Sequence, residues 1–318
     1  MATRRFAAAG VLAVAAVLGG SGLPAQSPDD RRAYSPVLAA LQAQLRSAGV
    51  THVAIDSVQL LFSNTSSAGV VPDELFANKV GHLLPSQFVE DDPRRGSPLN
   101  TIRYLVDQSD GEALSRDTAG NVFTLPNATT EPQIDAAMAV WGTVGCNGPL
   151  IEKVEDNGED PDVMDGLLLG DASLIGTPFA DVTHAGWLPA EFFDALMEFG
   201  SFRIAAMDIT FIFIDADGNP TDINRDGRGD VAFKELYYNG RLNWGADGDP
   251  FYVDIQTVAI HESGHAFGLG HFGKGVSRAP GPREFAPKAT MNPIYLGVDR
   301  RIYGTDHGSF CQIWAHRR

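Results

Sequence analysis

Three histidines and one glutamate lie within eleven residues, HESGHAFGLGH (261–271). His261 and His265 are four residues apart, so on a helix their side chains differ by about 40° around the axis and about 6 Å along it. Two imidazoles in this arrangement can converge on one metal ion, as in zinc sites with Zn–N distances of about 2.0–2.1 Å. Glu262, beside the first histidine, can reach a water molecule on the metal rather than the metal itself. That is the position of a general base.

A glycine precedes the last histidine, and this suggests how that histidine reaches the site. On a straight helix His271 would lie about 240° around the axis from His265, on the far face. Gly268 can adopt positive φ without steric cost, so we expect the helix to end there and the chain to turn back. His271 would then complete a three-nitrogen site with the fourth position open. The alternative is a chance pattern on a solvated helix, expected on the order of once in ten thousand chains of this length.

The histidine pair needs a helix to hold it, and residues 253–269 have the required periodicity. Further helices are predicted at 35–49, at 130–144 with Thr130 as N-cap, and at 188–200. Strands are predicted at 53–62, 101–108, 149–155, 208–215 and 231–239. We expect 208–215 to be buried and 231–239 to lie nearer an edge. This order of elements predicts the α+β class.

The first residues and the charge indicate an exported chain. Arg4 and Arg5 precede a short apolar stretch and a small residue at Ala25, which predicts a signal peptide over residues 1–25. No later apolar run is long enough for a stable membrane span, so we expect a secreted or periplasmic protein; a membrane anchor is the alternative. The formal net charge of -16 argues against nucleic acid or an anionic membrane as the main partner.

The chain has only two cysteines, Cys146 and Cys311. In an oxidising compartment an even pair predicts one disulfide, which would tie the middle of the chain to its C-terminal end. Two free, buried thiols are the alternative.

We divide the mature chain at a charged segment that contains proline and glycine, EDDPRRGSP (90–98). Residues 26–97 would form an N-terminal region, either a propeptide or an accessory segment, and residues 98–318 the main domain. Arg94 and Arg95 could mark a processing point, although a solvated linker is slightly favoured. The sequence leaves open whether the N-terminal region is cleaved, covers the site, or packs as part of the fold.

A second candidate metal site lies in DADGNPTDINRDGRGD (215–230). Oxygen-bearing side chains alternate there and a glycine follows, as in the first half of an EF-hand loop, but Phe233 stands where the bidentate glutamate would be. The candidate calcium ligands are Asp222, Asn224, Asp226 and Asp230. An ordinary polar turn is the alternative.

The pattern His261-Glu262-x-x-His265-x-x-Gly268-x-x-His271 resembles the zinc signature of the metzincin metalloproteases. The segment ATMNPIY (289–295) is similar to the methionine turn of the matrixins. By this resemblance, Met291 packs beneath the histidines and is not a ligand. An ordinary core methionine is the alternative.

The resemblance implies a metzincin-like catalytic domain. It would have a mixed twisted sheet, an active-site helix with a second helix behind it, and an irregular C-terminal subdomain that contains the Met-turn. It also implies a zinc endopeptidase with Glu262 as general base, structural calcium, and a protein or peptide substrate. Residues 231–239 would be the edge strand that pairs with an extended substrate. The sequence does not indicate an oligomeric state.

Some features depart from the matrixin pattern. Phe272 stands where matrixins have serine, the segment from His271 to Met291 is longer than theirs, and residues 157–205 look like an insertion. The N-terminal region has no cysteine to bind the metal. Two other functions stay open: a catalytically silent binding protein on a protease scaffold, and a zinc amidase that acts on cell-wall peptides.

Overall fold

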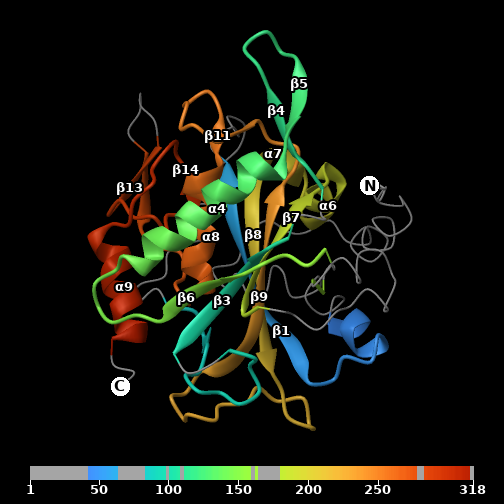
Figure 1. The fold of residues 1–318 in the computed structure, drawn as a ribbon, viewed down its shortest axis with the longest axis vertical. Coiled ribbons are helices and arrows are strands. Elements are labelled where there is room, and N and C mark those ends of the chain that lie inside the picture. Colours follow the sequence, from blue (N-terminus) through green and yellow to red (C-terminus); the bar gives the residue numbers. More distant parts are fainter. Residues whose placement is uncertain are drawn as a thin grey trace.

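A mixed β-sheet forms the centre of the protein in the computed structural model (Figure 1). The structure describes residues 42–63, 83–97, 100–107, 111–158, 162–163, 180–277 and 283–315. The sheet has eight strands in the order β14-β1-β8-β9-β7-β3-β6, with β2 joined to β9. Strands β6, β3, β7 and β9 run parallel to one another, whereas β8 is antiparallel to both β9 and β1. Together with the helices this confirms the α+β class.

The strands of this sheet are β1 (Val53–Ser63), β2 (Ser86–Gln87), β3 (Thr101–Val106), β6 (Leu150–Val154), β7 (Val182–Leu188), β8 (Ile204–Phe213), β9 (Gly229–Asn239) and β14 (Ile294–Tyr295). Three small two-stranded sheets pair β4 (Ala113–Arg116) with β5 (Val122–Leu125), β10 (Trp244–Gly245) with β11 (Val253–Asp254), and β12 (Lys274–Ser277) with β13 (Arg283–Ala286). The helices are residues 42–47, α4 (Asn127–Gly142), α6 (Ala190–Leu196), α7 (Gly200–Arg203), α8 (Ile255–Ala266) and α9 (Gly304–Trp314).

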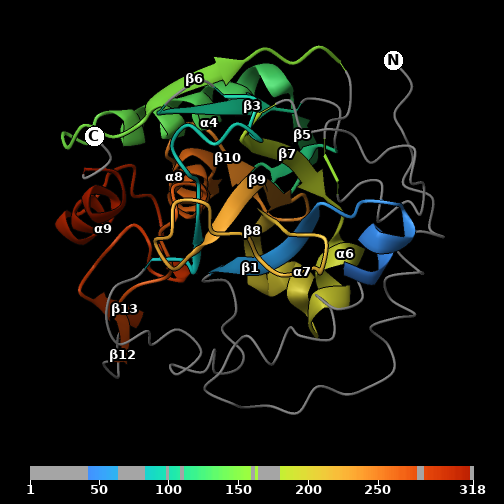
Figure 2. The same cartoon turned by 90° about the horizontal axis from the view of Figure 1, so that it is seen from below.

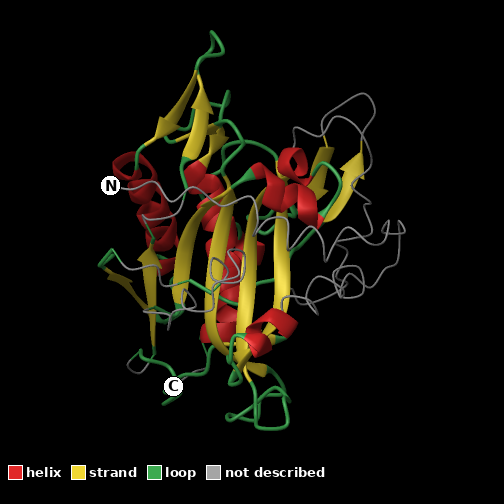
Figure 3. Ribbon diagram, turned by 90° about the vertical axis from the view of Figure 1, so that its right-hand side faces the viewer, coloured by secondary structure: helices red, strands yellow, loops and turns green. Residues whose placement is uncertain are grey.

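Helices cover both faces of the sheet (Figures 2 and 3). On one face α8 packs between the sheet and α4, and α9 lies beside them, so Trp141, Phe267 and Phe310 form one aromatic group. On the other face α6 packs against the sheet through Phe192 and Phe193. The two hydrophobic cores therefore meet through the sheet, and α8 lies in the larger of them.

Strand β1 joins the N-terminal region to the main domain across the division predicted at residue 97. It comes from the predicted N-terminal region, yet it pairs with β8 along almost its whole length. Of the three alternatives for this region, the described part packs within the fold. Residues 1–25, the predicted signal peptide, lie outside the described residues.

The two arginines of the expected linker are also part of the fold. Arg95 is buried, and its guanidinium bonds to the Asp181 carboxylate at 3.0 Å and to the carbonyl oxygens of Val89 and Thr101. Arg94 pairs with Asp230 at 2.7 Å. A solvated linker at this point is therefore wrong, because both guanidinium groups are held by carboxylates.

Two strands correct the predicted arrangement of the sheet. The expected edge strand, 231–239, is β9, which lies inside the sheet with β8 on one side and β7 on the other. All of its residues after Gly229 are buried, so both of its faces are covered. Strand β7 was not predicted at all and lies within the supposed insertion 157–205, so at least residues 182–188 belong to the sheet.

The helix at 130–144 begins earlier than predicted. Helix α4 starts at Asn127 after Pro126, whose φ of -71° already suits the entry to a helix. Thr130 is inside the helix, because its N–H bonds to the carbonyl oxygen of Pro126 at 3.2 Å. Thr130 is therefore not the N-cap, as the sequence had suggested.

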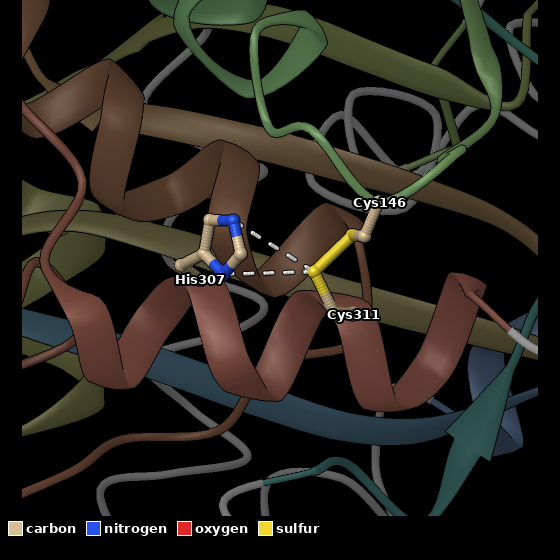
Figure 4. The surroundings of a disulfide bond; sticks show 3 residues. All are labelled: Cys146, His307 and Cys311. Atoms are coloured by element: carbon tan, nitrogen blue, oxygen red, sulfur yellow. Dashed lines mark hydrogen bonds between the residues drawn. A yellow bond between two sulfur atoms is a disulfide. The ribbon is translucent and has the colours of Figure 1, made fainter.

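A disulfide joins Cys146, after α4, to Cys311 on α9, with 5.6 Å between their Cα atoms (Figure 4). The His307 ring lies beside it on the same helix, 3.6 Å from the sulfur of Cys311. The disulfide bond joins the two segments that flank α8.

In the part of the chain that is described, no helix is both long enough and apolar enough to cross a membrane.

Candidate metal centre

Helix α8, which carries the first two histidines, is fixed at its N-terminus by Asp254. The carboxylate of Asp254 accepts hydrogen bonds from the N–H and the hydroxyl of Thr257, at 2.9 and 2.6 Å. Two guanidinium nitrogens of Arg300 donate hydrogen bonds to the same buried carboxylate, at 3.0 and 2.5 Å. A negative group at this end also suits the helix dipole. The start of α8 is therefore tied to the C-terminal part of the chain.

The end of α8 confirms the predicted role of Gly268. The helix ends at Ala266, and Gly268 has φ of +90°. The N–H of Leu269 bonds to the carbonyl oxygen of Gly264, and that of Gly268 to the carbonyl oxygen of His265. This pair of bonds is a Schellman motif, which reverses the chain after a helix. His271 is brought back towards the helix as a result.

The three histidines converge. Their Nε2 atoms lie 3.1 Å apart for His261 and His265, and 3.2 Å apart for the two pairs that include His271. Nitrogens bound to one ion in tetrahedral geometry, at about 2.0–2.1 Å, would lie about 3.3 Å from one another. The group could therefore hold a metal ion. Among the described residues, no other cluster of His, Cys, Asp and Glu brings three ligand atoms within 4.8 Å of one another.

Hydrogen bonds at the Nδ1 atoms of two histidines determine where their Nε2 lone pairs point. Nδ1 of His261 donates to the carbonyl oxygen of Thr290, and Nδ1 of His265 donates to that of Leu269, both at 2.8 Å. With the proton on Nδ1, each Nε2 presents a lone pair to the centre of the triangle. Burial lowers the pKa of His261 to about 4, and it also lowers the pKa of His265 and His271 well below the usual value. The neutral rings that metal binding requires are thus favoured.

Glu262 lies in the same buried site. Its side chain is fully enclosed, and neither carboxylate oxygen has a hydrogen-bond partner among the described residues. Burial raises its pKa well above the usual value, and the charge of Asp208 adds to this effect. A buried carboxylate without a partner is costly unless a ligand or water completes it. Its position fits a group that acts on a molecule bound at the metal.

The methionine turn lies directly against α8. Met291 is buried, and a Cβ atom added at Gly264, between the two helical histidines, would lie only 2.3 Å from its sulfur. Asp306 on α9 holds the turn, because its carboxylate accepts the N–H groups of Thr290 and Met291 at 2.8 and 3.2 Å. Met291 therefore supports the helix at the level of the site, and its turn carries the carbonyl group that orients His261.

Sequence reasoning missed several groups that position this site. The indole N–H of Trp141 donates to the carbonyl oxygen of Ile260 at 2.9 Å. The buried ammonium of Lys234 on β9 donates to the carbonyl oxygen of His265 at 2.7 Å, and lies 3.6 Å from the carboxylate of Asp208. Lys234 and Asp208 lie on neighbouring strands and form no sequence motif. The only sequence signal was that both lie in predicted strands, where side chains point alternately to the two faces.

A cavity of about 170 Å³ opens beside His261. It is bounded by α8 at Thr257, by the chain after the methionine turn, and by Leu61 of β1. Tyr295 is part of its wall, and its hydroxyl accepts the N–H of Asp254 at 3.0 Å. This cavity adjoins a candidate ligand, His261, and could receive a substrate side chain.

The acidic loop gives no comparable arrangement. The carboxylate of Asp222 accepts the N–H groups of Asp226 and Gly227, which is the geometry of a polar turn. Asp230 is buried and bonds to Arg94 and to the hydroxyl of Thr221, so its carboxylate is already occupied. Calcium at Asp222, Asn224 and Asp226 stays a prediction.

No known family model matches this sequence, and no curated protein matches it.

Proposed function

We propose that the protein is a secreted, zinc-dependent endopeptidase related to the metzincins. The observation that supports it most is the triangle of Nε2 atoms from His261, His265 and His271 beside the unpartnered carboxylate of Glu262. Three neutral nitrogens suit zinc, and three protein ligands leave a fourth position open, as in catalytic zinc sites. Export is supported by the disulfide, which forms and persists in oxidising compartments.

Zinc, when bound, would acidify a water molecule and polarise the carbonyl group of the bond to be cleaved. Glu262 accepts the proton of the attacking water and passes it to the leaving amine. Thr290 and Leu269 keep the protons of His261 and His265 on Nδ1, away from the ion.

The test is a Glu262→Gln variant, assayed for zinc content and for hydrolysis of a peptide library. We expect one zinc per chain in both proteins and a loss of turnover of several orders of magnitude in the variant, because the proton acceptor is removed while the ligands stay. Glu284→Gln, at an exposed position on β13, is the matched control and should behave as wild type. Turnover near wild type in Glu262→Gln would refute the assigned base, and chains that fold without zinc would refute the metal site.

A further inference from the structure

Strand β1 fills a slot between two other strands at the metal site. On one side it runs antiparallel to β8, and on the other parallel to β14, where Phe62 faces Ile294 and Ser63 faces Tyr295. The N–H of Phe62 also bonds to the carbonyl oxygen of Pro293 at 3.0 Å. Strand β14 directly follows the turn that contains Met291. The C-terminal part of β1 is therefore held between β8 and the chain that supports the histidines.

One side chain of β1 reaches the metal site itself. Leu61 packs in the same core as α8 and lines the cavity beside His261. Its neighbours Leu60 and Phe62 belong to the core on the opposite face of the sheet, as alternation along a strand requires. Leu61 thus places an aliphatic side chain in the wall of a cavity that adjoins the candidate zinc ligand His261.

With β1 in place the side chains of the site are buried. His261, His265 and His271 are at most 5% exposed, and Glu262 is fully buried. The edges of β8 and β14 that face the slot are both paired, so neither offers free backbone groups to an incoming chain. Without β1 these two edges would flank a space one strand wide, which an extended polypeptide can enter by adding a strand.

We infer that β1 is a built-in occupant of the substrate groove and keeps the proposed peptidase latent. This inference rests on the proposed function. A substrate would lie in the direction of β1, antiparallel to β8 and parallel to β14, with an aliphatic side chain where β1 has Leu61. Full activity then requires β1 to leave the slot, and the turnover of wild type comes from the fraction of molecules in which it has left.

The pairing of β1 suits a strand that can be displaced. Its register with β8 is irregular at two places, between Ile55 and Ser57 and again between Leu61 and Phe62. Such irregularities interrupt the ladder locally. Residues 54–59 are only half-buried, so the anchoring of the strand is concentrated in its last four residues. Within this end Leu61 packs in the core that contains α8, whereas Leu60 and Phe62 pack in the other core, so shortening Leu61 should free the strand on the side of the site.

The test compares two adjacent substitutions in the full-length chain, Leu61→Ala and Leu60→Ala. Both remove the same atoms from β1, but only Leu61 lines the cavity beside His261. We expect Leu61→Ala to raise zinc-dependent peptide hydrolysis at least tenfold over wild type, and to speed removal of zinc by a chelator. Leu60→Ala should change the rate of peptide hydrolysis and the rate of zinc removal much less. A peptide with the β1 sequence, VAIDSVQLLFS, should inhibit Leu61→Ala, and the same peptide with aspartate at the Leu61 position should not.

The outcomes separate this inference from the proposed function. If wild type and Leu61→Ala hydrolyse peptides equally fast with equal zinc, the inference is overturned and the peptidase stands. If neither protein hydrolyses any peptide, the proposed peptidase function is overturned. The rate at which a chelator removes zinc then tests whether β1 covers the site. Faster zinc loss from Leu61→Ala than from Leu60→Ala would support the inference that β1 covers the site. Equal rates would overturn it. Should Leu61→Ala not fold, Leu61→Val should show the same effects at smaller size.

Discussion

Alanine at Gly264 should destabilise the protein, although alanine normally favours a helix. The residue lies inside α8 between His261 and His265, and its Cβ would meet the sulfur of Met291 at 2.3 Å and the Trp141 ring at 2.9 Å. A glycine-to-alanine change in a helix contributes about 0.5–1 kcal/mol of stability, but overpacking a core costs about 1–3 kcal/mol. We expect a net loss of about 1–2 kcal/mol and weaker zinc binding, because the helix and the methionine turn must move apart.

Gly308 provides the matched control. It also lies within a helix, α9, but it is exposed and a Cβ there would meet nothing within 4 Å. Gly308→Ala should therefore stabilise the protein by about 0.5–1 kcal/mol. The assay is urea unfolding at fixed free zinc, with zinc affinity measured by competition with a chelating dye. A Gly264→Ala protein that is as stable as wild type and binds zinc equally well would refute the close packing of Met291 on α8.

Two further predictions concern buried polar groups. Asp306→Ala should lower zinc affinity about 10–100-fold, the usual effect of losing an outer partner of a metal site, because the turn that orients His261 loses its anchor; unchanged affinity in the dye assay would contradict this. Burial lowers the pKa of His184 to about 3, whereas the unfolded value is about 6.5, so below that pH only the unfolded chain takes up this proton and stability falls. Between pH 7 and 4.5 this contributes roughly 2–3 kcal/mol, and urea unfolding of His184→Gln should lack that part of the decrease; an equal decrease in both proteins would argue against it.

The parts of the site that sequence reasoning anticipated depend on residues close together in the chain. The spacing of His261 and His265 fixes their common face on a helix, and Gly268 can be assigned a turn because few other residues adopt positive φ easily. The return of His271 follows from these two facts. Local geometry alone was sufficient here, since all the atoms concerned lie within eleven residues.

The parts that were missed depend on pairing between distant segments. The edge position of β9 was wrong because the residues of a strand do not determine which other strands lie alongside it. Arg95 was placed in a linker because its partner Asp181 is far away in the sequence. The same reason explains why Asp306 and Lys234 were not recognised as supports of the site. Charged residues with remote partners look like surface residues until the fold is known.

The place of β1 in the chain has a consequence for how the protein folds. During synthesis β1 emerges before every strand that pairs with it, because β8 and β14 both come much later in the sequence. Its apolar end, Leu60 to Phe62, has no sheet to join until then. Contacts between such distant segments form slowly, because a long loop must close first. We therefore expect β1 to dock late, and a chain that stops before residue 294 to lack one wall of the slot.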